Sequence, residues 1–389
     1  MRIDFLLAAC ALSFTCNLVM ATEYADLEPK IPPGYEPLEA VTEKGLWMEL
    51  EEYETAIQRS ALLVKDEYIN NYVKTAACRV AGDYCGDLRI YIIRNPSFNA
   101  SMTANGIMQV WTGLLVRVSS EDELAAVLGH ELAHYTQLHT LARLHDIRKK
   151  MTAGTLVDFG IMLATGVAIP VGQLTAIATV MSFSRDQERE ADLLGVKFMA
   201  QSGYDPHAAA MVWEMIVQEE ESAAAKREEP GLFSKTHPDA TRRIASLNLL
   251  VSEIYPDVTP EAENRRSHVE MLNRYYLMLM EDQLDTNRFG RTQNILQIHR
   301  DIGVEPGLIN FFQGEMYRQR NADGDLALAQ ESYELSIQGN RPIAEAYRNL
   351  GYLFLKQDNP SQAFENFNHY LELNPDADDR AMIEFYLQE

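Results

Sequence analysis

The sequence contains little positive charge. Of its 389 residues, 34 are Lys or Arg and 57 are Asp or Glu, which gives a formal net charge of −23. Binding of nucleic-acid phosphates needs a basic face, so this balance argues against a nucleic-acid partner. With 47% apolar residues the chain is still long enough to form two domains, each with its own core.

Cysteine is also scarce, and two of the four cysteines fall in a segment outside the expected fold. Residues 1–21 are predicted to be a cleavable signal peptide, because residues 5–20 form an apolar run and Ala21 ends a small-residue cleavage site. Two alternatives stay open. Cys10 closes a lipobox-like tetrapeptide, and the apolar run could remain as an anchor.

The remaining cysteines, Cys78 and Cys85, are candidates for a disulfide. They flank a short glycine-containing loop. In an oxidising compartment closure of such a loop stabilises a fold by about 2–3 kcal/mol. The alternative is two free thiols, one at a helix end and one in a turn. Two thiols at this spacing do not make a zinc site.

After the signal peptide, no apolar run is long enough to span a membrane. Residues 151–183 come nearest, since Asp158 is the only charge between Lys150 and Arg185. Pro170 divides this stretch, and neither half reaches the roughly 20 apolar residues that a spanning helix needs. It is interpreted either as a buried helical pair or as a hairpin that makes peripheral contact with a membrane.

The rest of the chain is predicted to form a leader and two domains. Residues 22–42 contain four prolines and are expected to be an extended leader. Residues 43–255 show helical periodicity, interrupted by β-rich segments at 88–93 and 107–111. The expected fold class is mainly α: an α+β catalytic domain with a small β-sheet, followed by an α-helical repeat domain.

Residues 265–389 carry the repeat signal. Ala329 and Ala363, like Tyr333 and Phe367, are separated by 34 positions, the period of the tetratricopeptide helix-turn-helix unit. Arrays of this kind present a concave binding face, so this domain is expected to dock a partner. The alternative is a helical cap that only stabilises the catalytic domain.

A short motif carries the chemistry. His130-Glu131-Leu132-Ala133-His134 has the HExxH form and lies in a predicted helix that begins near residue 119. Positions four apart share a helix face, so His130 and His134 can bind one zinc ion. Glu131 is then placed to act as general base on a water molecule activated by the metal.

Catalytic zinc needs a third protein ligand. The segment 184–192 is rich in carboxylates, and Glu188 and Asp192 lie one helical turn apart. Glu188 is the candidate ligand, Asp192 the candidate acceptor from a ligand imidazole, and Glu190 is expected to be solvated. His139 is set aside because a continuous helix would turn it away from the metal. The alternative is an ordinary charged surface helix.

The HELAH motif, the SRDQEREAD segment and Thr236-His237-Pro238 occur in an order that resembles metallopeptidase family forty-eight. This is the family of the HtpX and CAAX-prenyl proteases. Together with the signal peptide and the repeats, the similarity is greatest to its BepA-type periplasmic peptidases, although the repeat region is shorter here. The resemblance covers nearly all of the mature chain.

The resemblance implies that His130, His134 and Glu188 bind one Zn²⁺ per subunit. Glu131 would be the general base, and Asp192 would accept a hydrogen bond from a ligand imidazole. The resemblance also implies a periplasmic location and a role in quality control, in which misfolded or stalled outer-membrane proteins are degraded or their assembly is assisted. The repeats would dock on the outer-membrane β-barrel assembly machinery.

His237 and residues 107–111 carry two further expectations. The resemblance implies that His237 can occupy the open zinc position and hold the enzyme off, while an oxyanion role and a plain helix-start residue are alternatives. The strand at 107–111 is expected to be the sheet edge that receives an extended substrate. A rival function is a chaperone or adaptor that acts through its repeats, with a self-inhibited zinc site.

Overall fold

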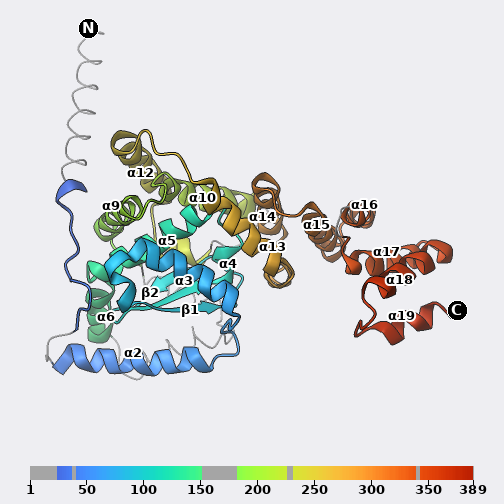
Figure 1. Cartoon of the computed structure of the whole chain (residues 1–389), viewed down its shortest axis with the longest axis horizontal. Coiled ribbons are helices and arrows are strands. Elements are labelled where there is room, and N and C mark those ends of the chain that lie inside the picture. Colours follow the sequence, from blue (N-terminus) through green and yellow to red (C-terminus); the bar gives the residue numbers. More distant parts are fainter. Residues whose placement is uncertain (1–23, 37–40, 151–181, 226–230, 339–341, 389) are drawn as a thin grey trace, which may run out of the picture. The chain divides into compact units, whose positions relative to one another are not determined.

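The computed structural model (Figure 1) describes residues 24–36, 41–150, 182–225, 231–338 and 342–388. The chain divides into two compact units, Met1–His268 and Val269–Glu389. The predicted signal peptide and residues 151–181 of the predicted membrane-contacting stretch lie outside the described residues. The predicted fold class is confirmed, because the described residues form many helices and a small three-stranded sheet.

The sheet belongs to the first unit. It contains β1 (Arg89–Ile93), β2 (Ala100–Met102) and β3 (Ile107–Trp111) in the order β1-β3-β2. β3 is parallel to β1 and antiparallel to β2. The expectation that residues 107–111 form the sheet edge is therefore wrong, because both sides of β3 are already paired.

The turn between β2 and β3 explains this order. Gly106 has φ +88°, and a Cβ there would lie 2.2 Å from the carbonyl oxygen of Asp87. Only glycine fits such a position without strain. The tight turn folds β2 back along one side of β3, while β1 pairs with the other side, with Arg89 opposite Ile107.

The helix α5 (Glu121–Thr136) carries the HExxH motif through the centre of the first unit. Ser120 caps it by accepting a hydrogen bond from the backbone N–H of Glu123. Every residue from 122 to 136 is buried. This burial on all sides explains why polar groups in this helix have to find partners inside the protein.

The helix α9 (Arg185–Gln201) crosses α5 at close range. A Cβ on Gly195 of α9 would lie 3.2 Å from the backbone nitrogen of His130, and one on Gly129 of α5 would lie 3.3 Å from the oxygen of Gly195. Two glycines therefore let the backbones approach. Ser184 and Gln187 form a capping box that fixes the start of α9, and this start holds the predicted third ligand.

The other elements of this unit surround the sheet and α5. They are α2 (Val41–Arg59), α3 (Glu67–Ala81), η1 (Gly82–Asp87), α4 (Thr112–Leu115), α6 (His139–Lys150), α10 (Ala208–Ala225), α11 (Leu232–Thr236) and α12 (Ala240–Ile254). A disulfide between Cys78 and Cys85 joins α3 to η1. Across the described residues, no helix combines the length and apolar character needed to cross a membrane.

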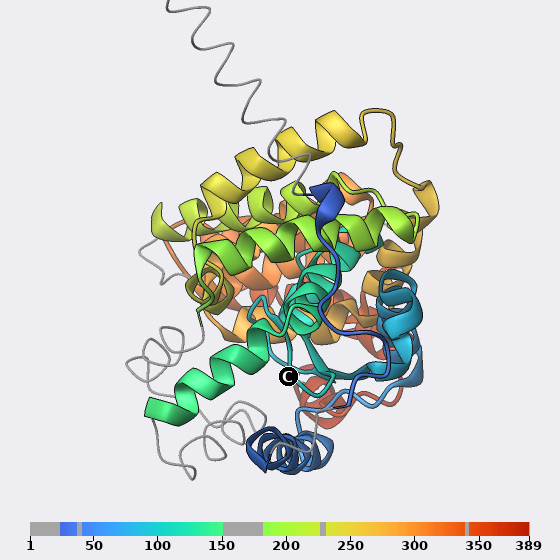
Figure 2. The ribbon, with the colours of Figure 1, turned by 90° about the vertical axis from the view of Figure 1, so that its left-hand side faces the viewer.

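Residues 24–36 of the predicted leader lie against this unit, and Figure 2 shows them in dark blue beside the green helices. The backbone N–H of Lys30 donates to the carbonyl of Thr136 at the end of α5. Lys197 on α9 donates to the carbonyl of Leu27, and the side chain of Ile31 is buried. The described part of the leader is thus packed against the fold.

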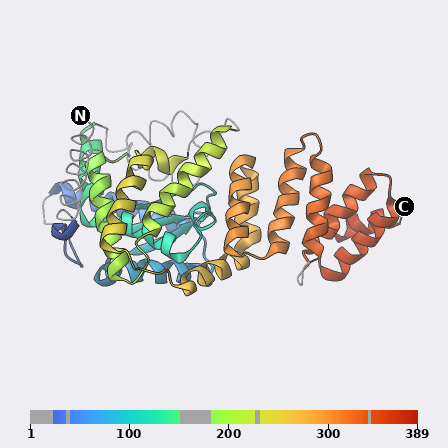
Figure 3. The same ribbon diagram turned by 90° about the horizontal axis from the view of Figure 1, so that it is seen from above.

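The second unit consists of helix pairs, which Figure 3 shows side by side. Its elements are the end of α13 (Ala262–Asp285), then α14 (Phe289–Ile302), α15 (Pro306–Arg320), α16 (Asp325–Ile337), α17 (Ala344–Lys356), α18 (Pro360–Leu373) and α19 (Arg380–Tyr386). A Cβ on Gly314 would meet the ring of Tyr333 at 2.5 Å, and one on Gly351 would meet the ring of Phe367 at 2.4 Å. The pairs α15–α16 and α17–α18 therefore each place an aromatic ring of one helix against a glycine of the other, and the two aromatic positions are 34 residues apart.

Acidification is expected to destabilise the first unit through His268. Its side chain is fully buried and its Nδ1 lies 2.8 Å from the hydroxyl of Tyr72. Burial lowers the pKa of His268 from 6.5 to about 4. His268 of the unfolded chain is therefore protonated below about pH 6.5, whereas in the folded chain it is protonated only below about pH 4. The free energy of unfolding consequently decreases as the pH falls from 6.5 to 4. The loss is about 3 kcal/mol in total.

Urea unfolding at pH 7 and pH 4.5 measures this effect. The loss of unfolding free energy between the two pH values should be smaller in His268→Gln than in the wild type, by roughly 2 kcal/mol. The control is His369→Gln, which alters an exposed histidine. Equal acid sensitivity of the wild type and His268→Gln would contradict the prediction.

Candidate metal centre

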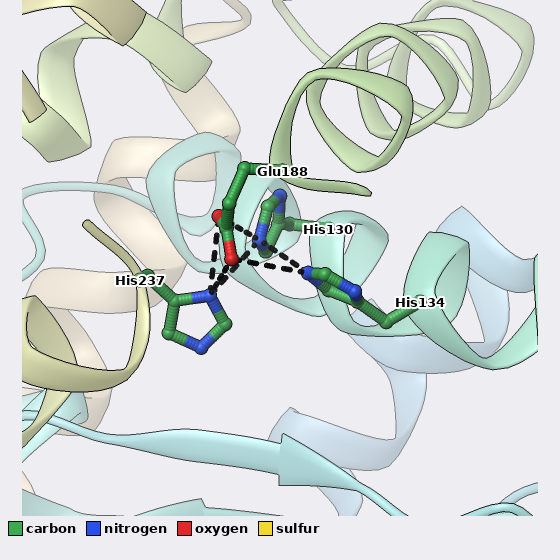
Figure 4. A group of neighbouring side chains, drawn as sticks. All are labelled: His130, His134, Glu188 and His237. Atoms are coloured by element: carbon green, nitrogen blue, oxygen red, sulfur yellow. Dashed lines mark hydrogen bonds and ion pairs between the residues drawn. The ribbon is translucent and has the colours of Figure 1, made fainter. Parts of the chain in front are cut away.

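Four side chains that can bind metal converge in the first unit. One donor atom from each of His130, His134, Glu188 and His237 lies within 4.8 Å of the others, and all four residues are buried. Figure 4 shows the rings of His130 and His134 on one helix, with Glu188 and His237 approaching from other segments. The structure thus brings together all three predicted ligands and the predicted regulatory histidine.

Most separations in this group lie near those expected for the ligands of one zinc ion, and none exceeds 4.8 Å. His130 Nε2 lies 3.1 Å from His134 Nε2 and 3.5 Å from Glu188 Oε2. His237 Nδ1 lies 3.1 Å from Glu188 Oε1 and 3.4 Å from His130 Nε2. Tetrahedral ligands about 2.0–2.1 Å from zinc are roughly 3.3 Å from one another. The nitrogen-rich donor set favours zinc over calcium or magnesium, which prefer oxygen ligands.

Local structure places each donor. His130 and His134 lie one turn apart on α5, and Glu188 lies in the first turn of α9. His237 directly follows α11, where its backbone N–H donates to the carbonyl of Phe233 at 2.8 Å. The rings of His237 and Phe233 are stacked with their centroids 4.3 Å apart. The three segments therefore hold the donors without relying on a long loop.

Glu131 lies beside these donors. Its side chain is buried, and its Oε1 is 3.6 Å from His237 Nε2. Among the described residues this oxygen has no hydrogen-bond partner. Burial raises the pKa of the Glu131 carboxyl above its usual 4.5. A buried carboxylate with a free oxygen and a raised pKa is suited to accept a proton from a reacting molecule.

Asp192 lies where the sequence predicted it. Its Oδ1 is 3.2 Å from Nδ1 of His130, on the side of the ring away from the donor group. Burial and Arg243 lower the pKa of His130, but hydrogen bonds to Asp192 and Glu188 outweigh them and raise it to about 9. These carboxylates therefore favour positive charge at this position.

Arg243, which lies between the two acids, was not predicted from the sequence. Its Nη1 is 2.5 Å from Glu188 Oε2, its Nε is 2.7 Å from Asp192 Oδ2, and its guanidinium lies 3.7 Å from the ring centre of Trp213. The chain shows only an Arg-Arg pair at 242–243 on a predicted helix. Nothing in that pair tells which arginine is buried, so sequence reasoning had no signal for it.

Burial and neighbouring charges together determine the protonation states of Glu188 and His134. Burial alone would raise the pKa of the Glu188 carboxyl, but His237 and Arg243 hold it well below its usual range. Burial, with His130 beside it, lowers the pKa of His134 well below 6.5. Glu188 is therefore an anion and His134 a neutral imidazole, which are the forms that bind a metal ion.

The surroundings of His139 and Glu190 differ from those predicted. His139 is outside the group of four donors, as expected, yet its Nδ1 lies 3.1 Å from Nδ1 of His134. Its Nε2 lies 3.1 Å from Glu190 Oε2. The side chain of Glu190 is 33% exposed, so it is partly solvated and also contacts His139. Burial lowers the pKa of His139, which favours its neutral form.

Comparison with known proteins agrees with this geometry. Residues 64–251 match the model of Peptidase family M48. This range includes all four donors and Glu131, Asp192 and Arg243. The predicted resemblance to metallopeptidase family forty-eight is thereby confirmed for this domain.

Individual relatives are distant. A putative beta-barrel assembly-enhancing protease of Vibrio cholerae is 25% identical over 235 residues, which cover 57% of this chain and 48% of that protein. The mitochondrial metalloendopeptidase OMA1 of Schizosaccharomyces pombe is 29% identical over 194 residues, 49% of this chain and 52% of that protein. The beta-barrel assembly-enhancing protease of Escherichia coli K12 is 24% identical over 256 residues, 63% of this chain and 52% of that protein. The chain spans about half the length of these relatives.

Proposed function

Residues 64–251 form a domain of Peptidase family M48, and from this we propose that the protein is a zinc-dependent endopeptidase. The observation that carries the proposal is the buried group of His130, His134 and Glu188, with a carboxylate oxygen of Glu131 beside it that accepts no hydrogen bond from the described residues. These three side chains would hold zinc. When bound, zinc supplies a Lewis acid that polarises the scissile carbonyl and lowers the pKa of the attacking water.

Proton transfer falls to Glu131. Its raised pKa makes it a better proton acceptor than an exposed glutamate. It takes the proton from the attacking water and passes it to the leaving amine. Asp192 holds the ring of His130 through Nδ1, so that Nε2 faces the ligand group.

We place the substrate along the outer side of β2. Among the described strands β2 pairs only with β3, so no strand covers its other side, where Thr140 of α6 donates a hydrogen bond to the carbonyl of Met102. An extended peptide would pair there by displacing Thr140. Pairing through the backbone does not read side chains, which suits cleavage of unfolded or stalled polypeptides. β2 thus takes the role that the sequence assigned to residues 107–111.

His237 is proposed to keep the resting site closed. Its Nδ1 faces Glu188 and His130 (Figure 4), where it completes the group of four donors. A fourth protein ligand occupies the position that catalytic zinc sites leave open. Its displacement by a substrate would open the site. The oxyanion role remains the alternative, with Nε2 as donor.

The cellular role is proposed from the relatives. Two of them are named beta-barrel assembly-enhancing proteases, so quality control of outer-membrane proteins in the periplasm is the role we favour. The helix pairs of Val269–Glu389 would dock the β-barrel assembly machinery. Peripheral membrane contact through residues 151–183 belongs to the same proposal. The rival is a chaperone or adaptor, which the position of His237 beside Glu188 and His130 favours.

Metal removal tests the enzymatic proposal. A chelator should abolish cleavage of an unfolded casein by the purified full chain, and one equivalent of Zn²⁺ should restore it, because Glu131 alone does not polarise the carbonyl. Cleavage and metal content are measured on the same samples. Full activity in metal-free protein would overturn the proposal.

A His237→Ala arm of this assay separates the two roles of His237. If His237 closes the site, the variant cleaves faster than the wild type at equal zinc content. If His237 stabilises the oxyanion, the variant loses roughly 10²–10³-fold in kcat. If neither the wild type nor His237→Ala cleaves the substrate when loaded with zinc, the chaperone or adaptor function is supported instead.

A further inference from the structure

We propose that His139 is a positioning residue, which acts with Glu190 to fix the protonation and orientation of His134 for zinc binding. This inference rests on the proposed zinc site and deepens it. The three side chains form a line from the site to the surface: His134 is fully buried, His139 is 4% exposed and Glu190 is intermediate.

A left-handed residue brings His139 back to the site. Helix α5 ends at Thr136, and α6 begins at His139. Between them Leu138 has φ +59°, a conformation rarely adopted by a leucine. In a continuous helix His139 would point away from His134. The sharp turn at Leu138 instead folds His139 against the side of His134 that faces away from the donors.

The hydrogen bonds assign one proton to each contact. The carboxylate of Glu190 can only accept, so Nε2 of His139 carries the proton in the 3.1 Å contact between them. A neutral His139 then has a bare Nδ1. The 3.1 Å contact between the two Nδ1 atoms requires a donor, which is His134. Nε2 of His134 is left unprotonated and faces His130 and Glu188.

The plane of the His134 ring is held as well. Phe183 stacks on it with centroids 3.8 Å apart and an interplanar angle of 23°. Stacking permits rotation within the ring plane, and the hydrogen bond to His139 stops it. His130 receives the equivalent support from Asp192. Each ligand histidine therefore has its own partner on Nδ1, as metal-binding histidines in general do.

Glu190 has a second neighbour on the leader. Nζ of Lys30 lies 3.5 Å from Glu190 Oε2, with both side chains partly exposed. An exposed pair of this kind contributes little by itself. The positioning effect is therefore assigned to the contact between His139 and Glu190, and Lys30 is not required for it.

A pair of variants at one position tests the inference. In His139→Leu the acceptor for His134 is lost, and the zinc dissociation constant should rise roughly 10- to 100-fold. In His139→Asn the side-chain oxygen can take the place of Nδ1, so the affinity should return to within a few-fold of the wild type. Both variants remove the ring, so a purely structural role predicts equal losses.

Zinc affinity is measured on the full chain by competition with a chromophoric chelator, and circular dichroism shows that each variant is folded. His145→Leu on the same helix is the matched control and should bind zinc like the wild type. Glu190→Gln should weaken binding less than His139→Leu does. Equal affinities of His139→Leu and the wild type would overturn the inference, and so would equal losses in the Leu and Asn variants. A wild type that binds no zinc would instead refute the proposed function.

Discussion

Replacement of Glu131 by Gln is expected to lower the turnover of unfolded substrate by roughly 10²–10⁴-fold. The amide is nearly the same size as the carboxylate but cannot accept the proton of the attacking water. Glu131 is not one of the four grouped donors, so the zinc content should not change. The measurement is kcat on an unfolded polypeptide, together with metal analysis of the same protein.

Glu253→Gln is the matched control, because Glu253 is an exposed glutamate on α12. It should cleave at the wild-type rate. A Glu131→Gln protein that keeps its zinc and more than a tenth of its turnover would show that another group is the base. Loss of zinc along with activity would place Glu131 among the ligands.

The same variant separates the two proposed functions in cells. A peptidase whose role is degradation should lose clearance of stalled outer-membrane proteins when Glu131 is replaced. A chaperone or adaptor that acts through Val269–Glu389 should keep its function, because the helix pairs of that unit are untouched. Unchanged clearance would thus refute the peptidase as the working part of the protein.

Local helical geometry explains which parts of the site were predictable. His130 and His134 are four residues apart in a helix, so their shared face follows from the 3.6-residue period. Glu188 and Asp192 share a face on α9 for the same reason. That the two helices meet depends on Gly129 and Gly195, whose close approach no sequence period indicates.

The errors in the prediction share one origin, since each concerns a tertiary contact that a local sequence pattern does not show. His139 was placed by continuing a helix that in fact ends at Thr136 and restarts after a left-handed Leu138. β3 was predicted at the edge because alternating residues identify a strand but not its neighbours. Arg243 was missed because burial of one arginine in a pair is decided by tertiary contacts with distant acids.

Replacement of Glu188 by Gln is expected to weaken zinc binding by more than roughly 100-fold, beyond the range for residues that only support a ligand. The change removes the anionic donor from the group, whose other three members are neutral when they bind metal. It also removes one of the two carboxylates that contact Arg243, so the net charge around the donors becomes more positive and disfavours binding of a cation.

Asp186→Asn is the matched control, because Asp186 lies in the same first turn of α9 with an exposed side chain. It removes the same charge from the start of the helix but not from the donor group. Chelator competition should therefore give a wild-type dissociation constant for Asp186→Asn and a much larger one for Glu188→Gln. If both variants weakened zinc binding equally, the negative charge at the start of α9, rather than coordination by Glu188, would account for the loss. Full zinc occupancy of Glu188→Gln under competition would leave His237 as the third protein ligand, and closure of the site by that residue would then no longer follow.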